Sequence, residues 1–535
     1  MAETGQTTPQ RTLGWRWAAA VFAVALALRL AYFPTAAADP TFAHPFLDAL
    51  WNLQHASAIA HGRIVAPEPF YRAPLYTYAL AVLLVLARGS LLLVHLGQLI
   101  LGSITAVLVG MLGARLFGRG AGALAGLLYG TAATVLFFDF ELLNSAVFLP
   151  LAVAALLATE HATRDPSPAR FFAAGLAIGF AAIARPDILA FAPAALALAV
   201  LAARGSGWRP GRILAAGGLL CAGLASPIAP VTAYNLLAGR DAVLISSEGG
   251  VAFFVCNNPA ADGYTATMPG PTDTASYATD GIYTDNIESS GRYGARLALH
   301  HDPKPSEVSR YWTGRALAWI AQHPGAWARL TLRRAYFLLG GFEIGDQKNL
   351  TYFLETWWPF RVLPRWWWLF PLAVAALTLP GDHRGRLLLA AFAVTYGAVL
   401  VIFVPEERLR LAIYPAVCIL AARLLVASAS ALRARRSSGV ALRLAFAAAL
   451  VPVMMWDPIG YSIRERTDAR IARAQLSERG GDAARAEQLF LEALAIDPGR
   501  PRPRHAYAAF LARHGRESEA RAIGGLDYHE LSGRP

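Results

Sequence analysis

The stretch WRWAAAVFAVALALRLAYFPTA, residues 15–36, is apolar over almost its whole length. A helix needs about 20 such residues to cross the hydrocarbon core of a bilayer, so this stretch predicts a membrane span. A signal peptide would also be apolar and near the N-terminus. No convincing small-residue cleavage site follows the run, so we expect it to stay in the protein as a span.

Similar runs recur along the 535 residues, 56% of which are hydrophobic and only 16% charged. Soluble proteins carry about a quarter charged residues. The sequence therefore predicts an all-α polytopic membrane protein with about 11 transmembrane helices. The expected spans are 15–36, 90–113, 120–138, 143–160, 170–184, 186–203, 212–235, 365–380, 386–404, 408–428 and 440–457.

The net charge of +12 comes mostly from arginines in short connections between the apolar runs, not from a basic stripe. This distribution argues against a nucleic-acid partner and indicates topology, because cytoplasmic loops are enriched in Arg and Lys. One orientation, with the N-terminus inside, brings almost all of these clusters to the cytoplasm. They contain Arg115 and Arg119, Arg164 and Arg170, Arg204 with Arg209 and Arg212, Arg384 and Arg386, and Arg433 to Arg443.

The same orientation leaves two long segments outside. Residues 37–89 form the first external loop, whose apolar part of about 13 residues is short for a span and predicts an interfacial or re-entrant helix. Residues 236–364 predict a mixed external loop domain, since a connection of this length usually serves a function. The remaining membrane parts are an N-terminal core, 10–235, which includes the first loop, and C-terminal helices, 365–457.

Residues 465–535 have a different composition and helical periodicity. Leu476 corresponds to Leu511, and Ala486 to Ala520, at an offset close to that of tetratricopeptide repeats, which are helix–turn–helix units of 34 residues. About two units fit. Fewer than three are rarely stable alone, so we expect this external module to rest on the membrane domain or on a protein partner.

Charged and polar residues gather in the predicted external turns. The first is in HPFLDALWNLQHASAIAHG, residues 44–62, where Asp48 stands among apolar and aromatic side chains. Arginine suits phosphate because its planar fork binds two oxygens, and a carboxylate suits a hydroxyl proton. The pattern favours transfer of a group from a phosphate-linked lipid to a hydroxyl. The other members are Tyr71, Arg72, Asp139, Glu141, Arg185, Asp187, Glu406, Glu407, Arg408 and Arg410.

In the order of its motifs, the chain resembles the GT-C glycosyltransferases, in the bacterial branch similar to protein O-mannosyltransferases and to the aminoarabinose transferase of lipid A. The resemblance covers roughly residues 10–430 and departs from many relatives at Ala49, where they have a second acid. It is carried by LDALWNLQHASAIAHG, FYRAPLYTYALA, FDFELLNS, IARPDILAFAPA, YNLLAGRDAVLISSEGGVAFFVCNNPAADGY and ERLRLAIYPAVCILAA.

The resemblance implies a GT-C-like bundle in the bacterial inner membrane, with external juxtamembrane helices, that uses a polyprenyl- or dolichyl-phosphate-linked sugar. It implies that Asp48 and Glu141 are catalytic and that Arg408 and Arg410 meet the carrier phosphate. We expect an inverting displacement in which Asp48 takes the acceptor proton and the arginines, with Arg72, stabilise the leaving group. Further expected substrate contacts are Tyr71, Asp139, Arg185, Asn258 and Glu343.

Structural explanations stand beside these roles. Asp48 could cap a helix, Arg72 could extend to headgroups, Arg185 could pair locally with Asp187, and Asn258 sits in strong turn chemistry. No metal is assigned, because the histidines lack zinc-like spacing and the three cysteines make no cluster. A divalent ion stays open, since related oligosaccharyltransferases use one.

Two other functions stay open as well. One is a non-catalytic envelope-assembly scaffold that recruits proteins through its repeats. The other is a transporter, although no half-to-half repeat of the kind common in transporters is visible. The sugar and the acceptor, which the resemblance leaves as a protein, a glycan or a lipid, do not follow from the sequence.

Overall fold

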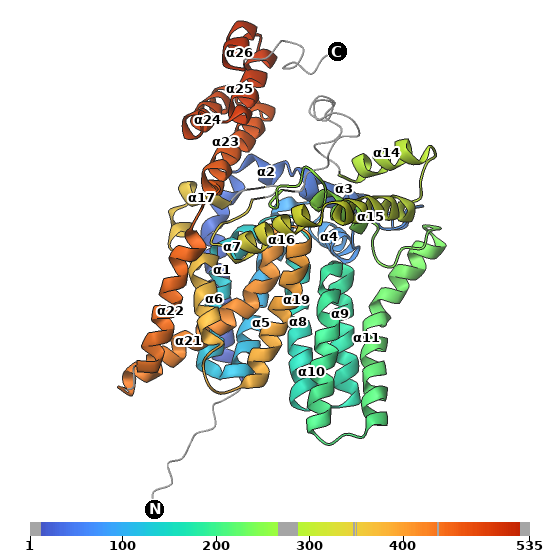
Figure 1. Cartoon of the computed structure of the whole chain (residues 1–535), viewed down its shortest axis with the longest axis vertical. Coiled ribbons are helices and arrows are strands. Elements are labelled where there is room, and N and C mark those ends of the chain that lie inside the picture. The colour runs from blue at the N-terminus through green and yellow to red at the C-terminus, as the bar shows by residue number, and fades with distance from the viewer. Residues whose placement is uncertain (1–11, 266–286, 346–347, 349, 436–437, 525–535) are drawn as a thin grey trace, which may run out of the picture.

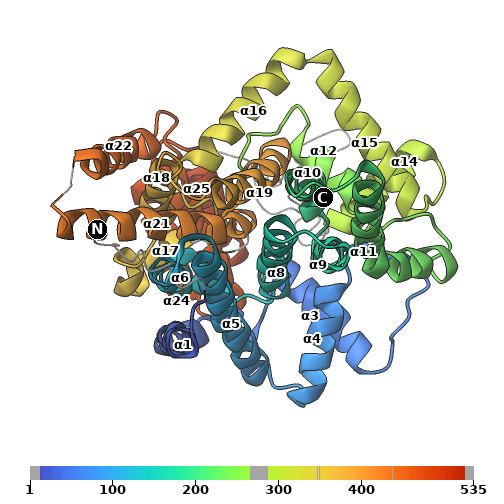
Figure 2. The same ribbon diagram turned by 90° about the horizontal axis from the view of Figure 1, so that it is seen from below.

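The structure is a computed structural model that describes residues 12–265, 287–345, 348, 350–435 and 438–524. Within these ranges the chain forms helices and no strands. The helices of the membrane part stand roughly side by side, and shorter helices cover one end of the bundle (Figure 1). Figure 2 shows the same helices viewed from below, where α5 and α8 lie between α1 and the group of α9, α10 and α11.

Seven segments of the described chain are long and apolar enough to cross a membrane, so the chain is a multi-pass membrane protein. They are α1 (Trp15–Ala37), α5 (Leu91–Phe117), α8 (Ser145–Arg164), η1 (Pro186–Phe191) continuing into α10 (Ala192–Gly205), α11 (Pro210–Leu237), α19 (His383–Ile402), and the run from α20 (Glu407–Arg410) through η3 (Leu411–Ile413) to α21 (Tyr414–Arg433).

The other predicted spans fall on shorter helices, so the count of eleven stays a prediction. The third predicted span is interrupted at Thr131 and Ala132, where one helix ends and the next begins. The helices concerned are α6 (Arg119–Gly130) with α7 (Ala133–Phe138), α9 (Pro168–Ala184), α18 (Trp366–Ala376) and α22 (Ser438–Met455).

Small residues allow the membrane helices to approach closely. An added Cβ at Gly122 of α6 would collide with the Gly110 carbonyl of α5. An added Cβ at Gly175 of α9 would collide with the Leu220 carbonyl of α11. Helix pairs in membranes associate through such backbone contacts, because lipid gives little hydrophobic drive for association.

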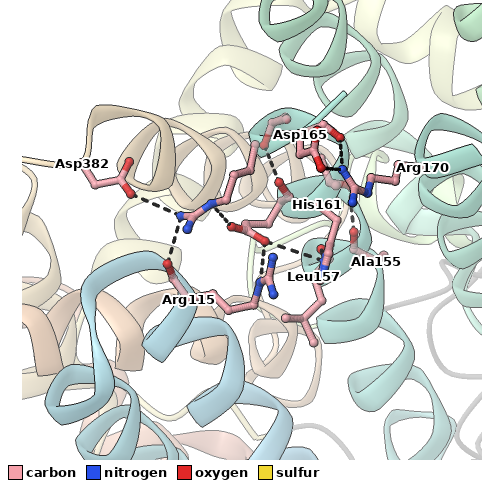
Figure 3. A network of polar contacts seen from close by, with 11 residues as sticks. Arg115, Ala155, Leu157, His161, Asp165, Arg170 and Asp382 are labelled. Atoms are coloured by element: carbon pink, nitrogen blue, oxygen red, sulfur yellow. Dashed lines mark hydrogen bonds and ion pairs between the residues drawn. The ribbon is translucent and has the colours of Figure 1, made fainter. Parts of the chain in front are cut away.

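A buried carboxylate joins the helices at the lower end of the bundle. Glu160 of α8 accepts from Arg115 Nε at 2.7 Å and lies 2.6 Å from Arg164 Nε. Arg164 also approaches Asp382, the N-cap residue of α19, at 3.7 Å. Figure 3 shows this network, with Asp382 and Arg115 at its left and His161 to their right. Arg115 and Arg164, which the sequence assigns to cytoplasmic connections, thus also hold α5, α8 and the start of α19 together.

The described parts of both long segments predicted outside lie at the upper end of the helix bundle (Figure 1). The first forms α2 (Pro40–Ala43), α3 (Leu47–Ala60) and α4 (Leu75–Leu86), the last of which is apolar but below span length. The second forms α12 (Gly249–Cys256), α14 (Ile287–Leu299), α15 (Pro305–Gln322), α16 (Pro324–Leu339), α17 (Leu350–Thr356) and η2 (Trp358–Arg361).

Within the described residues this second segment consists of helices joined by irregular stretches such as 257–265 and 340–345, and its standing as a mixed external domain stays a prediction. Proline at the first helical position favours a helix start, because its missing N–H has no partner there and its φ is already helical. Pro305 and Pro324 occupy such positions in α15 and α16, and Glu307 accepts from the Lys304 N–H at 2.8 Å. Residues 266–286 lie outside the described ranges.

The C-terminal residues form two successive helix pairs at the upper end. These are α23 (Tyr461–Arg479) with α24 (Ala483–Ile496), and α25 (Pro501–Arg513) with α26 (Glu517–Gly524). Ala486, Leu511 and Ala520 are buried between them. The helix–turn–helix pattern was predicted, whereas its assignment to tetratricopeptide repeats stays a prediction. The first pair packs on the membrane part, where α23 contacts α2 and α17.

Candidate active site

A cavity of about 390 Å³ opens at the upper end of the bundle. One part of its wall is charged and includes Asp48, Arg72, Glu248 and Arg408. Another part is apolar and comes largely from the ends of membrane segments: Leu189, Leu244, Val399, Leu400, Phe403 and Val404. A cavity with these two surfaces can take an amphiphile whose polar group is anionic.

Asp48 lies in the first turn of α3 and points its carboxylate between two guanidinium groups. Its Oδ1 is 2.5 Å from Arg72 Nη2, and its Oδ2 is 2.5 Å from Arg408 Nη1. The preceding residue, Leu47, has φ 51°, a left-handed conformation that is uncommon for a residue other than glycine. This backbone conformation fixes how α3 begins and therefore where Asp48 points.

Arg408 reaches the cavity because the chain leaves α19 in an irregular segment before α20. Glu406 Oε2 accepts from Arg408 Nε at 2.9 Å, and the Glu406 side chain is almost fully buried. The N–H of Glu407 donates to the Ile344 carbonyl at 3.0 Å, which fastens this segment to the chain after α16. Glu406 and Asp48 thereby hold the Arg408 guanidinium from two sides.

Arg72 precedes α4 and meets two acids. Besides Asp48, Glu248 Oε2 lies 3.9 Å from Arg72 Nε. The guanidinium also lies over the Trp51 ring, 4.7 Å from its centroid, in a cation–π contact. Glu248, Arg72, Asp48, Arg408 and Glu406 therefore form a row of alternating charges along the cavity wall.

The acids of this row titrate differently. Burial alone would raise the pKa of Asp48, but the charges of Arg72 and Arg408 and their hydrogen bonds hold that pKa well below its usual range. Burial raises the pKa of Glu248 to about 7 against the opposing charge of Arg72, with a further upward contribution from Asp48. The cavity thus holds one strongly ionised acid and one acid that titrates near neutral pH.

Two other predicted residues line the same cavity. Arg185, at the end of α9, donates from Nε to Asp187 Oδ2 at 2.9 Å and lies 5.6 Å from the Phe148 ring centroid. Tyr71 lies beside Arg72, and burial raises the pKa of its hydroxyl well above the usual value. The structure therefore brings Asp48, Tyr71, Arg72, Arg185 and Arg408 to one cavity.

Arg410 and Glu343 do not line this cavity. Arg410 is fully buried and donates to the Gly340 carbonyl at 3.2 Å, the Phe342 carbonyl at 2.7 Å and Glu343 Oε2 at 3.0 Å. Arg408 and Arg410 thus leave the same short helix in different directions. The second arginine ties α20 to the chain that follows α16.

The remaining predicted residues have partners outside the cavity lining. Asp139 pairs with Arg29 of α1, whose Nε is 2.9 Å from Oδ2. Glu141 Oε1 lies 2.5 Å from Lys348 Nζ. The side-chain amide of Asn258 donates to the Phe254 carbonyl at 3.0 Å, which is local turn bonding.

Glu248 is a cavity residue that was not predicted from the sequence, although it belongs to the segment YNLLAGRDAVLISSEGGVAFFVCNNPAADGY. Its signal was a single acid before two glycines, which also fits an ordinary turn. The Ser247 N–H donates to the Phe70 carbonyl at 3.0 Å and the Glu248 N–H donates to the Tyr71 carbonyl at 3.1 Å. Backbone pairing between two segments that lie far apart in the chain therefore places Glu248 beside Arg72.

No group of three or more His, Cys, Asp and Glu side chains that could hold a metal ion occurs among the described residues. The charged row has the chemistry of anion binding and proton acceptance. Two guanidiniums can share the oxygens of one phosphate, and Glu248 can accept a proton near neutral pH.

Residues 71–230 match the dolichyl-phosphate-mannose-protein mannosyltransferase family. The matched segment begins at Tyr71 and includes Arg72 and Arg185. The match supports a membrane glycosyltransferase over this part of the chain. No curated protein sequence matches the chain.

Three solved structures are distantly similar. ArnT from Cupriavidus metallidurans bound to undecaprenyl phosphate is 16% identical with a TM-score of 0.46, over 97% of this chain and 78% of that one. The oligosaccharyltransferase AglB from Archaeoglobus fulgidus, in complex with an inhibitory peptide and a dolichol-phosphate, is 16% identical with a TM-score of 0.38, over 87% and 56%.

The third is an oligosaccharyltransferase of Archaeoglobus fulgidus in the apo form, 13% identical with a TM-score of 0.39, over 97% of this chain and 61% of that one. The chain thus spans less than two thirds of both oligosaccharyltransferases.

Proposed function

We propose that the protein is a membrane glycosyltransferase that moves a sugar from a polyprenyl-phosphate-linked donor to a hydroxyl acceptor. The family match over residues 71–230 supports this class of enzyme. The observation that carries the proposal is the contact of Asp48 with both Arg72 and Arg408, 2.5 Å each, in a cavity that also has an apolar wall.

The two arginines have the position and chemistry of a phosphate clamp. Both donate to the Asp48 carboxylate, and a phosphodiester offers the same kind of anionic oxygen. The apolar wall formed by Leu189, Leu400 and Val404 suits the first part of a prenyl chain. A water-soluble nucleotide sugar would leave that wall without a partner.

The reaction is a single inverting displacement. The acceptor oxygen forms a bond to the anomeric carbon while the bond from that carbon to the phosphate oxygen breaks. The electron pair leaves with the polyprenyl phosphate, and the hydroxyl proton passes to a cavity carboxylate. Arg72 and Arg408 stabilise the negative charge that develops on the leaving group, where fixed positive charge lowers the barrier most.

The site belongs to the extracytoplasmic side of a bacterial plasma membrane in this proposal. Support comes from the distribution of arginine. The connections from α8 to α9, from α10 to α11 and from α18 to α19 lie at the end of the bundle opposite to α3 and α15 (Figure 1), and Arg164, Arg204 and Arg384 stand at or next to these connections in the sequence. The usual bias brings such connections to the cytoplasm. The C-terminal helices lie at the same end of the bundle as α3 and α15 (Figure 1).

The test is incubation of the purified full-length protein with a panel of polyprenyl-phosphate sugars, each with a serine-containing peptide, a short glycan or a lipid alcohol. We expect release of polyprenyl phosphate with at least one donor, and mass increase of one acceptor class. Folded protein that releases no carrier phosphate from any donor would overturn the proposal and favour an assembly scaffold.

A further inference from the structure

The geometry around Asp48 does not suit proton transfer. Both carboxylate oxygens are engaged, Oδ1 by Arg72 and Oδ2 by Arg408, at 2.5 Å each. A carboxylate that is so strongly stabilised as an anion has little tendency to take a proton, because the strength of a general base follows its pKa. Asp48 is better suited to hold the two guanidiniums at the spacing that a phosphate needs.

Glu248 has different surroundings in the same cavity. Its side chain is 36% exposed, more than the 21% of Asp48. Arg72 Nε lies 3.9 Å from its Oε2, which is too long for a hydrogen bond. Arg72 Nε, in turn, is buried without a hydrogen-bond partner among the described residues. The Glu248 carboxylate therefore lies beside Arg72 but does not form a hydrogen bond with it.

The backbone holds Glu248 in this place. Its N–H donates to the Tyr71 carbonyl at 3.1 Å, and the residue itself is the N-cap of α12. The helix is covered on its other side, because the Gly250 N–H donates to Ser309 Oγ of α15 at 3.0 Å. Because its backbone is held in this way, the Glu248 side chain can stay at a constant position relative to a bound substrate.

We propose that Glu248 is the catalytic base of the transfer, and that Asp48 is a positioning residue that holds Arg72 and Arg408. This inference rests on the proposed function. In the step, Glu248 takes the acceptor hydroxyl proton as the acceptor oxygen bonds to the anomeric carbon. The polyprenyl phosphate departs with the electron pair, held by Arg72 and Arg408.

The electrostatic surroundings support this division of roles. The pKa of Glu248 is about 7, because burial outweighs the charge of Arg72, so a large fraction is ionised at neutral pH and can still bind a proton firmly. A bound phosphate would add negative charge and draw Arg72 toward itself, and both effects raise the pKa of Glu248 further. The charged groups that face Glu248 are Asp48 on α3, Tyr71 and Arg72 before α4, Arg185 at the end of α9 and Asp187 in η1.

The experiment compares wild type, Glu248→Gln, Asp48→Asn and the matched control Glu68→Gln. Glu68 is an exposed acid of the first loop that pairs with Arg292 at 2.9 Å, outside the cavity. Turnover of the donor found in the panel is followed from pH 5 to pH 9 as release of polyprenyl phosphate. Binding of polyprenyl phosphate itself, without sugar, is measured in parallel by quenching of tryptophan fluorescence.

We expect kcat/KM of wild type and Glu68→Gln to fall as the pH drops through about 7, because kcat/KM reports protonation of the base in the free enzyme. Glu248→Gln should lose about 10²–10⁴-fold in turnover and the acid limb of the profile, yet bind polyprenyl phosphate as wild type does. The affinity of Asp48→Asn for polyprenyl phosphate should differ from that of wild type. Its residual activity should still fall at acidic pH, because Glu248 is intact.

Three results would overturn the inference. They are Glu248→Gln with near wild-type turnover, Glu248→Gln with reduced turnover but an unchanged acid limb, and loss of that limb in Asp48→Asn alone. A wild-type protein that releases no carrier phosphate would overturn the proposed function as well, so the two failures are distinguishable. Glu248→Asp, which keeps the acid, should recover part of the turnover and the pH dependence.

Discussion

Arg473 of α23 forms an ion pair with the buried carboxylate of Asp39, 434 positions earlier in the chain. The guanidinium also lies 4.3 Å from the ring centroid of Tyr352 and 5.3 Å from that of Phe353, both in α17. The C-terminal helices are therefore fastened to the first loop and to the second long segment together. The sequence left the membrane domain and a protein partner open as supports for this module, and the contact seen here is with loops of the membrane domain.

Arg473→Ala should loosen this module. The substitution leaves the Asp39 carboxylate, 3% exposed, without its arginine, and breaking a buried pair from one side costs about 3–5 kcal/mol. We expect faster proteolysis at the connection between α22 and α23, measured by limited digestion in detergent. Arg466→Ala, an exposed position of the same helix, is the matched control and should digest as wild type does. Equal digestion of both variants would contradict an anchoring role.

The two arginines of the ERLR motif should separate function from stability. Arg410→Ala leaves Glu343, 5% exposed, without its cation and removes bonds to two carbonyls, so we expect a loss of about 3–5 kcal/mol and a clearly lower Tm. Arg408→Ala, at a residue 23% exposed in the cavity, should leave the Tm closer to wild type and abolish turnover. Thermal unfolding in detergent and release of polyprenyl phosphate are the two measurements. A reversed ranking would show that Arg410, not Arg408, serves the phosphate.

The sequence was sufficient to predict that Asp48 and Arg408 belong to one end of the bundle. Each follows or precedes an apolar run, and counting runs from the N-terminus assigns both to the same side. The same count could not separate Arg408 from Arg410, because the direction of a side chain in a four-residue helix depends on the segments packed around it. Here Arg410 donates hydrogen bonds to the Gly340 and Phe342 carbonyls, which directs its side chain away from the cavity.

Long-range backbone pairing could not be predicted from the sequence either. Glu248 reaches the cavity because the N–H groups of residues 247 and 248 donate to the carbonyls of residues 70 and 71. No local sequence pattern predicts this contact. Arg29 had a usable signal, since a charge within a predicted span requires a partner. Its partner Asp139 could not be assigned from the sequence, because the pairing depends on α1 lying beside the turn after α7.

Asp48→Asn should reduce turnover by at least 100-fold while the protein still inserts and folds. The neutral amide cannot hold two guanidiniums through charge, so Arg72 and Arg408 repel each other and the clamp opens. The comparison is Asp302→Asn, an exposed acid that pairs with Arg292 at 3.1 Å away from the cavity lining. Carrier phosphate release and gel filtration together give activity and folding. Near wild-type release by folded Asp48→Asn would remove Asp48 from the site.

Gly102 tests whether the buried Arg29–Asp139 pair supports the bundle. A Cβ at this position of α5 would lie 2.5 Å from Asp139 Oδ2 and 2.7 Å from its Cγ, and Asp139 cannot move away without giving up Arg29. We therefore expect Gly102→Ala to lower the free energy of unfolding by about 1–3 kcal/mol, the usual cost of overpacking.

The matched control for Gly102→Ala is Gly218→Ala in α11, where an added Cβ would meet no heavy atom within 4 Å. Alanine there should leave stability unchanged or raise it by up to about 1 kcal/mol, because alanine costs less backbone entropy than glycine in a helix. Thermal unfolding in detergent compares the two. If both variants melt together, Asp139 has room to shift, and its pairing with Arg29 is not a fixed part of the bundle.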